Sequence, residues 1–171
     1  MEFKKQPFIP MLFGGDINTY SVARAFYEEY QVKTYVFGKF PSGPSYNSNI
    51  IEYHANLKID TDEVFMQTVR DFAAAHADKT VLTIGCGDSY VALCSRHKDE
   101  MPENVVAPYI DFELMDRLQQ KELFYRLCRE HDIDFPDTLV FRHGMDLDFE
   151  LPFSFPVILK PSNSVMYWEH D

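Results

Sequence analysis

The stretch Phe8-Ile9-Pro10-Met11-Leu12-Phe13-Gly14-Gly15-Asp16 decides the fold. Its first six residues form an apolar run of strand length, the two glycines permit a tight turn, and Asp16 can cap a following helix. That helix is predicted because apolar residues recur on one face of it, at Val22, Ala23, Phe26 and Tyr30. A strand, a glycine turn and a helix in this order form the repeating unit of a parallel α/β sheet.

The same unit returns further along the chain. Thr80 to Ile84 is a second apolar strand, Gly85-Cys86-Gly87 follows it, and Asp88 is placed to cap a helix that runs through Leu93. The other elements that we predict in this part are strands at 33–37, 50–54 and 104–110, a surface loop at 38–48, and a helix from 60 to 76–78. The alternation predicts an α/β fold with a parallel sheet.

The sequence pattern changes after about residue 115, and we place a domain boundary there, with domains at 1–115 and 116–171. A helical pattern covers 112–130 and is broken near its middle. Beyond Pro136 we predict two strands, at 138–141 and 157–160, separated by an acidic, proline-rich connector. The second part is too short to bury a core of its own.

Composition excludes several classes of protein. The chain has 171 residues, of which 46% are hydrophobic, so it can bury a core. A net charge of −11 disfavours nucleic acid as a partner, because binding to a polyanion relies on basic residues. The sequence has no run of about eighteen apolar residues and no signal peptide at its start, so we expect no membrane span and a cytoplasmic location.

Metal ligands are not expected within this chain. Its three cysteines, Cys86, Cys94 and Cys128, lack the two-residue separation of zinc ribbons and redox motifs, and we predict reduced, mostly buried thiols. The six histidines contain no pair at helical metal spacing. Cys86 stands at a predicted helix start, which favours a thiolate, but it has no neighbouring base in the sequence.

Two glycine-bearing strand ends are candidate ligand sites. Gly14, Gly15, Asp16 and Asn18, and with them Gly87 and Asp88, would lie at the carboxyl edge of the sheet, where open α/β folds bind ligands. Neither end has the third glycine of the dinucleotide fingerprint, and an aspartate there would repel a pyrophosphate, so a dinucleotide cofactor is the weaker interpretation. Glycines for tight turns and aspartates as helix caps explain the same residues equally well.

A pair of lysines in the second part suggests chemistry. Lys121 lies in an amphipathic helical pattern, and Lys160 ends the apolar stretch Pro156-Val157-Ile158-Leu159-Lys160-Pro161. A lysine after three apolar strand residues must reach solvent or meet an anion, because an unpaired ammonium in a dry site is costly. Each lysine taken singly fits an ordinary surface charge, whereas the two together with the proline-containing turn after the helix favour an anionic ligand.

These motifs resemble those of the ATP-grasp superfamily, which includes biotin carboxylase, carbamoyl phosphate synthetase and D-alanine:D-alanine ligase. The turn at 131–138 is similar to the family's "G-I-P-x-P-x-T" turn, and 156–161 to its "P-V-V-x-K-P" strand. The stretch from Ser162 to Trp168 is similar to a carboxylate-amine ligase subgroup whose known members are the peptidoglycan D-aspartate ligases. Residues 8–110 resemble the Rossmann-like pre-ATP-grasp domain, so the resemblance spans nearly the whole chain.

The resemblance implies an ATP-dependent carboxylate-amine ligase with an acyl phosphate mechanism. Lys121 and Lys160 would lie against ATP phosphates, and the strand-end loops, together with Ser162, would contribute to substrate binding. ATP and Mg²⁺ are the implied cofactors, with the magnesium ligands outside these residues. Small-molecule carboxylate and amine substrates are the implied partners, a peptidoglycan precursor among them, and the resemblance leaves a homodimer open. It assigns no catalytic residue.

Parts of the family pattern are missing from these 171 residues, namely the phosphate-covering loop, the strand that binds adenine and the acidic magnesium site. We therefore expect the second part to be the truncated start of an α+β ATP-grasp domain, and the chain alone to be inactive in ligation. A different class of function, a Rossmann-like binding or scaffold domain without catalysis, is the alternative. A reading frame that continues into a glycine-rich loop and an acidic site would favour the enzyme.

Overall fold

The structure is a computed structural model that describes residues 2–41, 43–146, 148 and 150–162. Contacts within the chain divide it into two compact units, Met1–Phe112 and Glu113–Asp171. The first unit contains a sheet with helices on its two faces, and the second contains helix α6 and most of α5.

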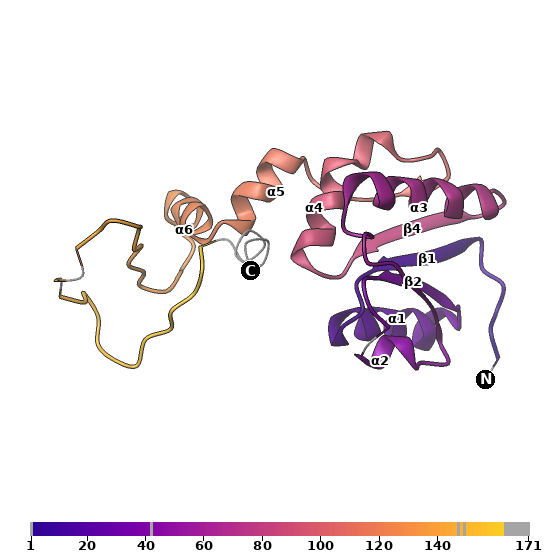
Figure 1. Cartoon of the computed structure of the whole chain (residues 1–171), viewed down its shortest axis with the longest axis horizontal. Coiled ribbons are helices and arrows are strands. Elements are labelled where there is room, and N and C mark those ends of the chain that lie inside the picture. The colour runs from indigo at the N-terminus through magenta and orange to yellow at the C-terminus, as the bar shows by residue number, and fades with distance from the viewer. Residues whose placement is uncertain (1, 42, 147, 149, 163–171) are drawn as a thin grey trace. The chain divides into compact units, whose positions relative to one another are not determined.

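Five parallel strands form the sheet of the first unit (Figure 1). They are β1 (Phe8–Phe13), β2 (Thr34–Gly38), β3 (Ile51–Ala55), β4 (Thr80–Gly85) and β5 (Val105–Val106). Their order across the sheet is β3-β2-β1-β4-β5, and Phe13 at the end of β1 lies opposite both Phe37 and Gly85. The predicted α/β class with a parallel sheet is therefore confirmed.

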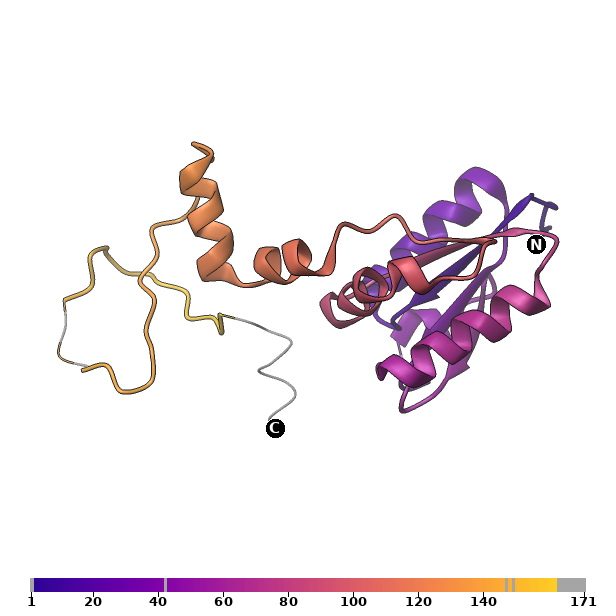
Figure 2. The same ribbon diagram turned by 90° about the horizontal axis from the view of Figure 1, so that it is seen from above.

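Helices cover both faces of this sheet, as Figures 1 and 2 show. They are α1 (Ile17–Tyr30), α2 (Gly43–Tyr46), α3 (Asp62–Ala75) and α4 (Asp88–Arg96), followed by a 3₁₀ turn at Lys98–Glu100. Helices α1 and α2 lie on one face, and α3 and α4 lie on the other. Helices on both faces explain why the central strands are apolar along nearly their whole length.

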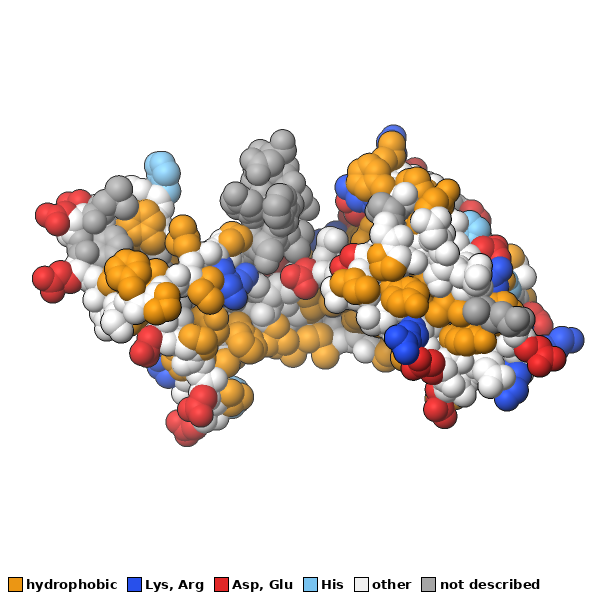
Figure 3. Space-filling view, turned by 90° about the horizontal axis from the view of Figure 1, so that it is seen from below, with side chains coloured by type: hydrophobic (Ala, Val, Ile, Leu, Met, Phe, Trp, Pro, Cys, Tyr) orange, Lys and Arg blue, Asp and Glu red, His pale blue; other side chains and the backbone are white. Residues whose placement is uncertain are grey.

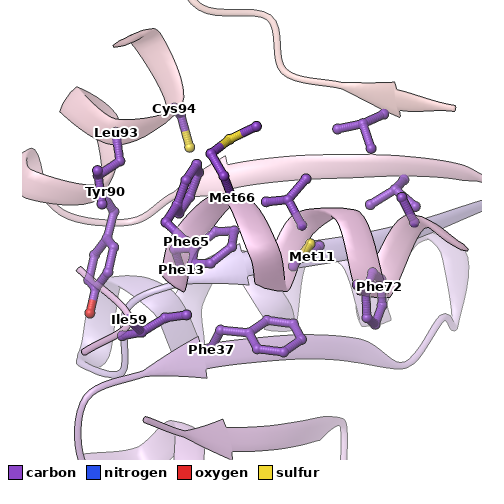
Figure 4. Packing of buried hydrophobic residues seen from close by; sticks show 14 of the residues in the cluster. Met11, Phe13, Phe37, Ile59, Phe65, Met66, Phe72, Tyr90, Leu93 and Cys94 are labelled. Atoms are coloured by element: carbon purple, nitrogen blue, oxygen red, sulfur yellow. The ribbon is translucent and has the colours of Figure 1, made fainter. Parts of the chain in front are cut away.

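Alternation along β1 divides the core into two layers. Met11 and Phe13 belong to the larger buried cluster, against α3 and α4, whereas Leu12 belongs to the smaller cluster against α1. Figure 4 shows the larger cluster, in which the rings of Phe13 and Phe65 lie 4.6 Å apart between centroids. Each fully buried side chain of this size stabilises the fold by about 1.5–3 kcal/mol.

The predicted bounds of two segments in the first unit need correction. The predicted surface loop at 38–48 contains the short helix α2, whose Ser45 is buried. The predicted strand at 104–110 is reduced to β5, two residues long. Pro108 interrupts that stretch, and proline has no N–H to donate to a sheet ladder.

The second unit confirms the predicted helical break and contradicts the predicted strands. Helices α5 (Phe112–Gln119) and α6 (Lys121–Glu130) are separated at Gln120. Among the described residues, neither 138–141 nor 157–160 forms a strand, and Leu159 is 96% exposed. An apolar run becomes a strand only where a neighbouring strand accepts and donates its backbone hydrogen bonds, and no strand is assigned among the described residues of this unit.

An apolar face of α1 is exposed. Figure 3 views the molecule from the side of α1 and α2 and shows hydrophobic side chains gathered there. A shallow hollow of about 480 Å³ on this helix is lined by Val22, Ala25, Phe26 and Tyr30, among others.

In the described part of the chain, no helix is long and apolar enough to cross a membrane.

Candidate ligand site and phosphate-binding residues

The two glycine-bearing loops meet at the carboxyl edge of the sheet. Gly14 N donates to Phe37 O at 2.9 Å, and Cys86 N donates to Phe13 O at 2.8 Å, so the ends of β1, β2 and β4 are tied together. Strands β1 and β4 are neighbours although some seventy residues separate them, and this is where the strand order reverses. Open α/β sheets bind their ligands in the crevice at such a switch point.

Gly14 is required by the backbone at this point. Its φ is +144°, a conformation that side chains rarely adopt, and a Cβ on it would overlap the hydroxyl of Thr19 and come within 3.3 Å of the Cβ of Cys86. The close approach brings the start of α1 against the loop after β4. A structural reason therefore accounts for Gly14, and its part in substrate binding stays a prediction.

Asp16 is the N-cap of α1, as predicted. Its Oδ1 accepts from the backbone N of Asn18 and from the backbone N and hydroxyl of Thr19, each at 3.1 Å. Its Oδ2 accepts from the side-chain amide of Asn18 at 3.0 Å. The cap thus engages both carboxylate oxygens of Asp16 and the side chain of Asn18. A substrate that contacted Asp16 or Asn18 would compete with these hydrogen bonds.

Asp88 does not cap α4, contrary to prediction. Gly87 is the N-cap, in an extended conformation, and Asp88 is the first helical residue. The helix begins one residue earlier than the capping pattern indicated, with Gly87 in the extended N-cap conformation and no side chain forming a cap hydrogen bond. Asp88 is exposed in the first turn, where a negative charge complements the helix dipole.

Tyr53 is a residue of this edge that the sequence analysis did not identify. Its hydroxyl donates to Phe40 O at 2.7 Å and lies 3.5 Å from Gly14 O. A Cβ on Gly15 would come within 2.5 Å of that hydroxyl, and one on Gly38 would overlap it. Tyr53 therefore needs glycine at both positions and ties the loop after β2 to the loop after β1. A glycine at each of two neighbouring strand ends was the available signal.

The surroundings of Cys86 disfavour its thiolate form at neutral pH. Burial raises the pKa of its thiol to about 11, and the nearby charge of Asp16 acts in the same direction, against a hydrogen bond with Thr19. Burial likewise raises the pKa of Cys94 to about 12. All three cysteines are free thiols, and Cys94 and Cys128 are buried, as predicted.

The second unit brings the segment containing Lys160 beside the helix that begins at Lys121. Lys121 is the first residue of α6, and its backbone N donates to Ser162 O at 3.1 Å. Lys160 is exposed and two residues from that hydrogen bond. This hydrogen bond brings the backbone of the segment that contains Lys160 to the start of α6. Residues 163–168, which complete the resembling stretch, lie outside the described part of the chain.

Within the described ranges, no group of three or more His, Cys, Asp or Glu side chains is placed to hold a metal ion. Mg²⁺ prefers oxygen ligands, and the described carboxylates form no such cluster.

Comparison with solved structures identifies a protein of the same fold. The chain is similar in structure to an L-amino acid ligase from Bacillus licheniformis, with a TM-score of 0.54 and 17% identity over 94% of this chain. At that identity the likeness shows the fold alone. No family model matches the sequence.

Sequence comparison is more specific. The chain is 40% identical to a D-aspartate ligase from Enterococcus faecium (strain Aus0004), over 96% of its own length. The resemblance predicted from the motifs is thereby confirmed. The chain spans 41% of that relative and 38% of the L-amino acid ligase.

Proposed function

We propose that this chain forms the N-terminal part of an ATP-dependent carboxylate-amine ligase. The observation that supports this most strongly is its 40% identity to a D-aspartate ligase over 96% of the chain. The order of the sheet domain, the helix with Lys121 and the segment with Lys160 agrees with the same assignment. An enzyme that uses ATP in this way is expected in the cytoplasm.

The reaction proceeds in two steps. A carboxylate oxygen of the first substrate attacks the terminal phosphorus of ATP, and ADP leaves, giving an acyl phosphate. The amine of the second substrate then attacks the acyl carbon, releasing inorganic phosphate and a proton and forming an amide. Mg²⁺, when bound, would neutralise charge on the transferring phosphoryl group.

Lys121 and Lys160 hold the polyphosphate in this proposal. Each ammonium group carries a positive charge that attracts phosphate, and it donates up to three hydrogen bonds. Placing cations where negative charge develops is the main way in which enzymes accelerate phosphoryl transfer. The exposed position of Lys160 leaves it accessible to a nucleotide from solvent.

The loops at the carboxyl edge hold the amino-acid substrate. Backbone groups at Gly15 and Gly87 are the contacts that we propose in these loops, with D-aspartate as the first candidate because of the relative's name. The amine acceptor in this proposal is a peptidoglycan precursor.

Phosphate release tests the proposal. Residues 1–171 would replace the matching region of the Enterococcus faecium D-aspartate ligase, and the chimaera would be assayed with ATP and a panel of D- and L-amino acids. We expect amino-acid-dependent release that Lys160→Ala lowers by about 100-fold or more. Lys58→Ala, at an exposed lysine of the first unit, is the matched control. Release unaffected by Lys160→Ala would refute the assignment of this lysine.

A further inference from the structure

A second hollow lies outside the candidate site, between the edge of the sheet and α3. It has a volume of about 330 Å³ and is lined by side chains of β2, β3 and the second half of α3. Strand β3 is the edge strand, so α3 leaves part of its face uncovered. The volume is at the lower end of the range of small-molecule sites.

Aromatic rings form the walls of this hollow. Phe72 packs against Tyr35 and Phe37, with centroids 5.1 and 5.6 Å away. His54 stacks on Phe37 at 4.9 Å with an interplanar angle of 14°. Figure 4 shows Phe37 on β2 and Phe72 on α3, and their rings are nearly perpendicular, at 81°. Phe37 and Phe72 are buried, whereas Tyr35 is half-buried and His54 is exposed, so these two rings are the ones that an apolar body or a cation can meet.

The polar groups of the hollow are mainly acceptors. His76 has Nδ1 2.8 Å from Phe72 O, and because a carbonyl only accepts, Nδ1 carries the proton and Nε2 is the acceptor of the neutral ring. The hydroxyl of Thr68 donates to Val64 O at 2.7 Å, so the lone pairs of its oxygen remain able to accept a hydrogen bond from a ligand.

Carboxylates add negative charge to this set of acceptors. Asp71 is exposed and its Oδ1 accepts from the side-chain amide of Gln67 at 2.7 Å, so the charge is not neutralised by that bond. Glu52 is paired with Lys33 at 2.9 Å and lies 3.5 Å from the ring of His54, so Asp71 is the carboxylate of the lining that forms no ion pair among the described residues. Because one carboxylate of the lining forms no ion pair among the described residues, the hollow favours a ligand that donates hydrogen bonds and carries a positive charge over an anion.

We propose that this hollow binds a small organic cation in which a protonated amine is attached to an apolar, preferably aromatic, body. The body lies against the rings of Tyr35 and His54, which are more exposed than those of Phe37 and Phe72, and the ammonium group donates to Asp71 and to Nε2 of His76. A metal ion is a poorer occupant, because no three-ligand group occurs among the described residues. The inference does not depend on the proposed ligase function.

Titration of the isotopically labelled chain with 2-phenylethylamine, followed by NMR, tests this proposal. At pH 7.5 the probe is protonated, and we expect saturable shifts that centre on Tyr35, Asp71 and His76, with a dissociation constant on the order of 0.1–1 mM. 2-Phenylethanol, which has the same body without the charge, should bind at least about tenfold more weakly.

The matched variants are Asp71→Asn and Asp78→Asn. Both residues are exposed, and only Asp71 lines the hollow. We expect Asp71→Asn to weaken binding about five- to tenfold, since it removes a charge-assisted hydrogen bond, and Asp78→Asn to leave it unchanged. Equal binding of amine and alcohol, shifts that centre elsewhere, an absence of saturation, or insensitivity to Asp71→Asn would each overturn the proposal.

Discussion

Single residues at the carboxyl edge of the sheet are explained by close backbone approach. Gly14 allows α1 to start against the loop after β4, and Gly15 and Gly38 allow the Tyr53 ring to pass. The glycine positions were visible in the sequence, and they predicted a turn. The partner of these glycines was not predictable, because a tyrosine in a strand pattern looks like any other strand residue until the fold places it over a neighbouring strand end.

Gly14→Ala tests the requirement at this position. The new Cβ would meet the Thr19 hydroxyl in a backbone conformation that alanine rarely adopts, so we expect the free energy of unfolding to fall by about 1–3 kcal/mol. Gly87→Ala is the matched control, since its Cβ would meet only the Tyr90 ring, at 4.0 Å, and it should cost less than about 1 kcal/mol. Urea unfolding of both variants gives the comparison, and equal losses would contradict this explanation.

Helices and strands were predicted where local sequence decides their geometry. The cap of α1 by Asp16 follows from residues within three positions of it, and it was correct. The prediction that Asp88 caps α4 was wrong by one position, because Gly87 is the N-cap. The strands at 138–141 and 157–160 failed for another reason, since a strand depends on a partner that apolar periodicity does not reveal.

Asp16→Ala tests the helix cap. We expect a loss of about 1 kcal/mol in the free energy of unfolding, because two backbone donors at the start of α1 lose their acceptor. Asp16→Asn should retain nearly all of the stability, since asparagine caps equally well. In the ligase chimaera, Asp16→Asn separates helix capping from substrate binding. A loss of activity with stability intact would mean that the negative charge of Asp16 contributes to substrate binding.

The ion pairs between α3 and the end of α4 predict a pH dependence. Burial acts to raise the pKa of Asp62, but hydrogen bonds from Arg96 and His97, at 2.8 and 2.6 Å, outweigh it and lower the pKa below its usual value. A lowered carboxyl pKa stabilises the fold above the unfolded pKa of about 3.9, and this stability is lost as pH falls through the folded pKa.

Asp62→Asn should therefore lower the free energy of unfolding at pH 7 by no more than about 1 kcal/mol, because 52% of the side chain is exposed. The difference between parent and variant should shrink at pH 3 and vanish below the folded pKa. Denaturant unfolding at several pH values measures it. A difference that stayed constant with pH would contradict the electrostatic explanation.

At the scale of the whole molecule, the chain combines a parallel α/β unit with a second unit that carries both lysines. The class of the first unit was predictable because its strands and helices alternate regularly along the sequence. The role of the second unit rested on motif resemblance, and the 40% identity to a D-aspartate ligase supports the resemblance without testing any one residue. The central claim is that Lys121 and Lys160 bind the phosphates of ATP.

Lysine acetylation in the ligase chimaera tests that claim most directly. The rate of modification of each lysine would be measured by mass spectrometry with and without ATP and magnesium. We expect the nucleotide to slow acetylation of Lys121 and Lys160 several-fold and to leave Lys58 unchanged, because a bound phosphate covers the ammonium groups. Acetylation of Lys121 and Lys160 at the same rate with and without saturating ATP would contradict the proposed function.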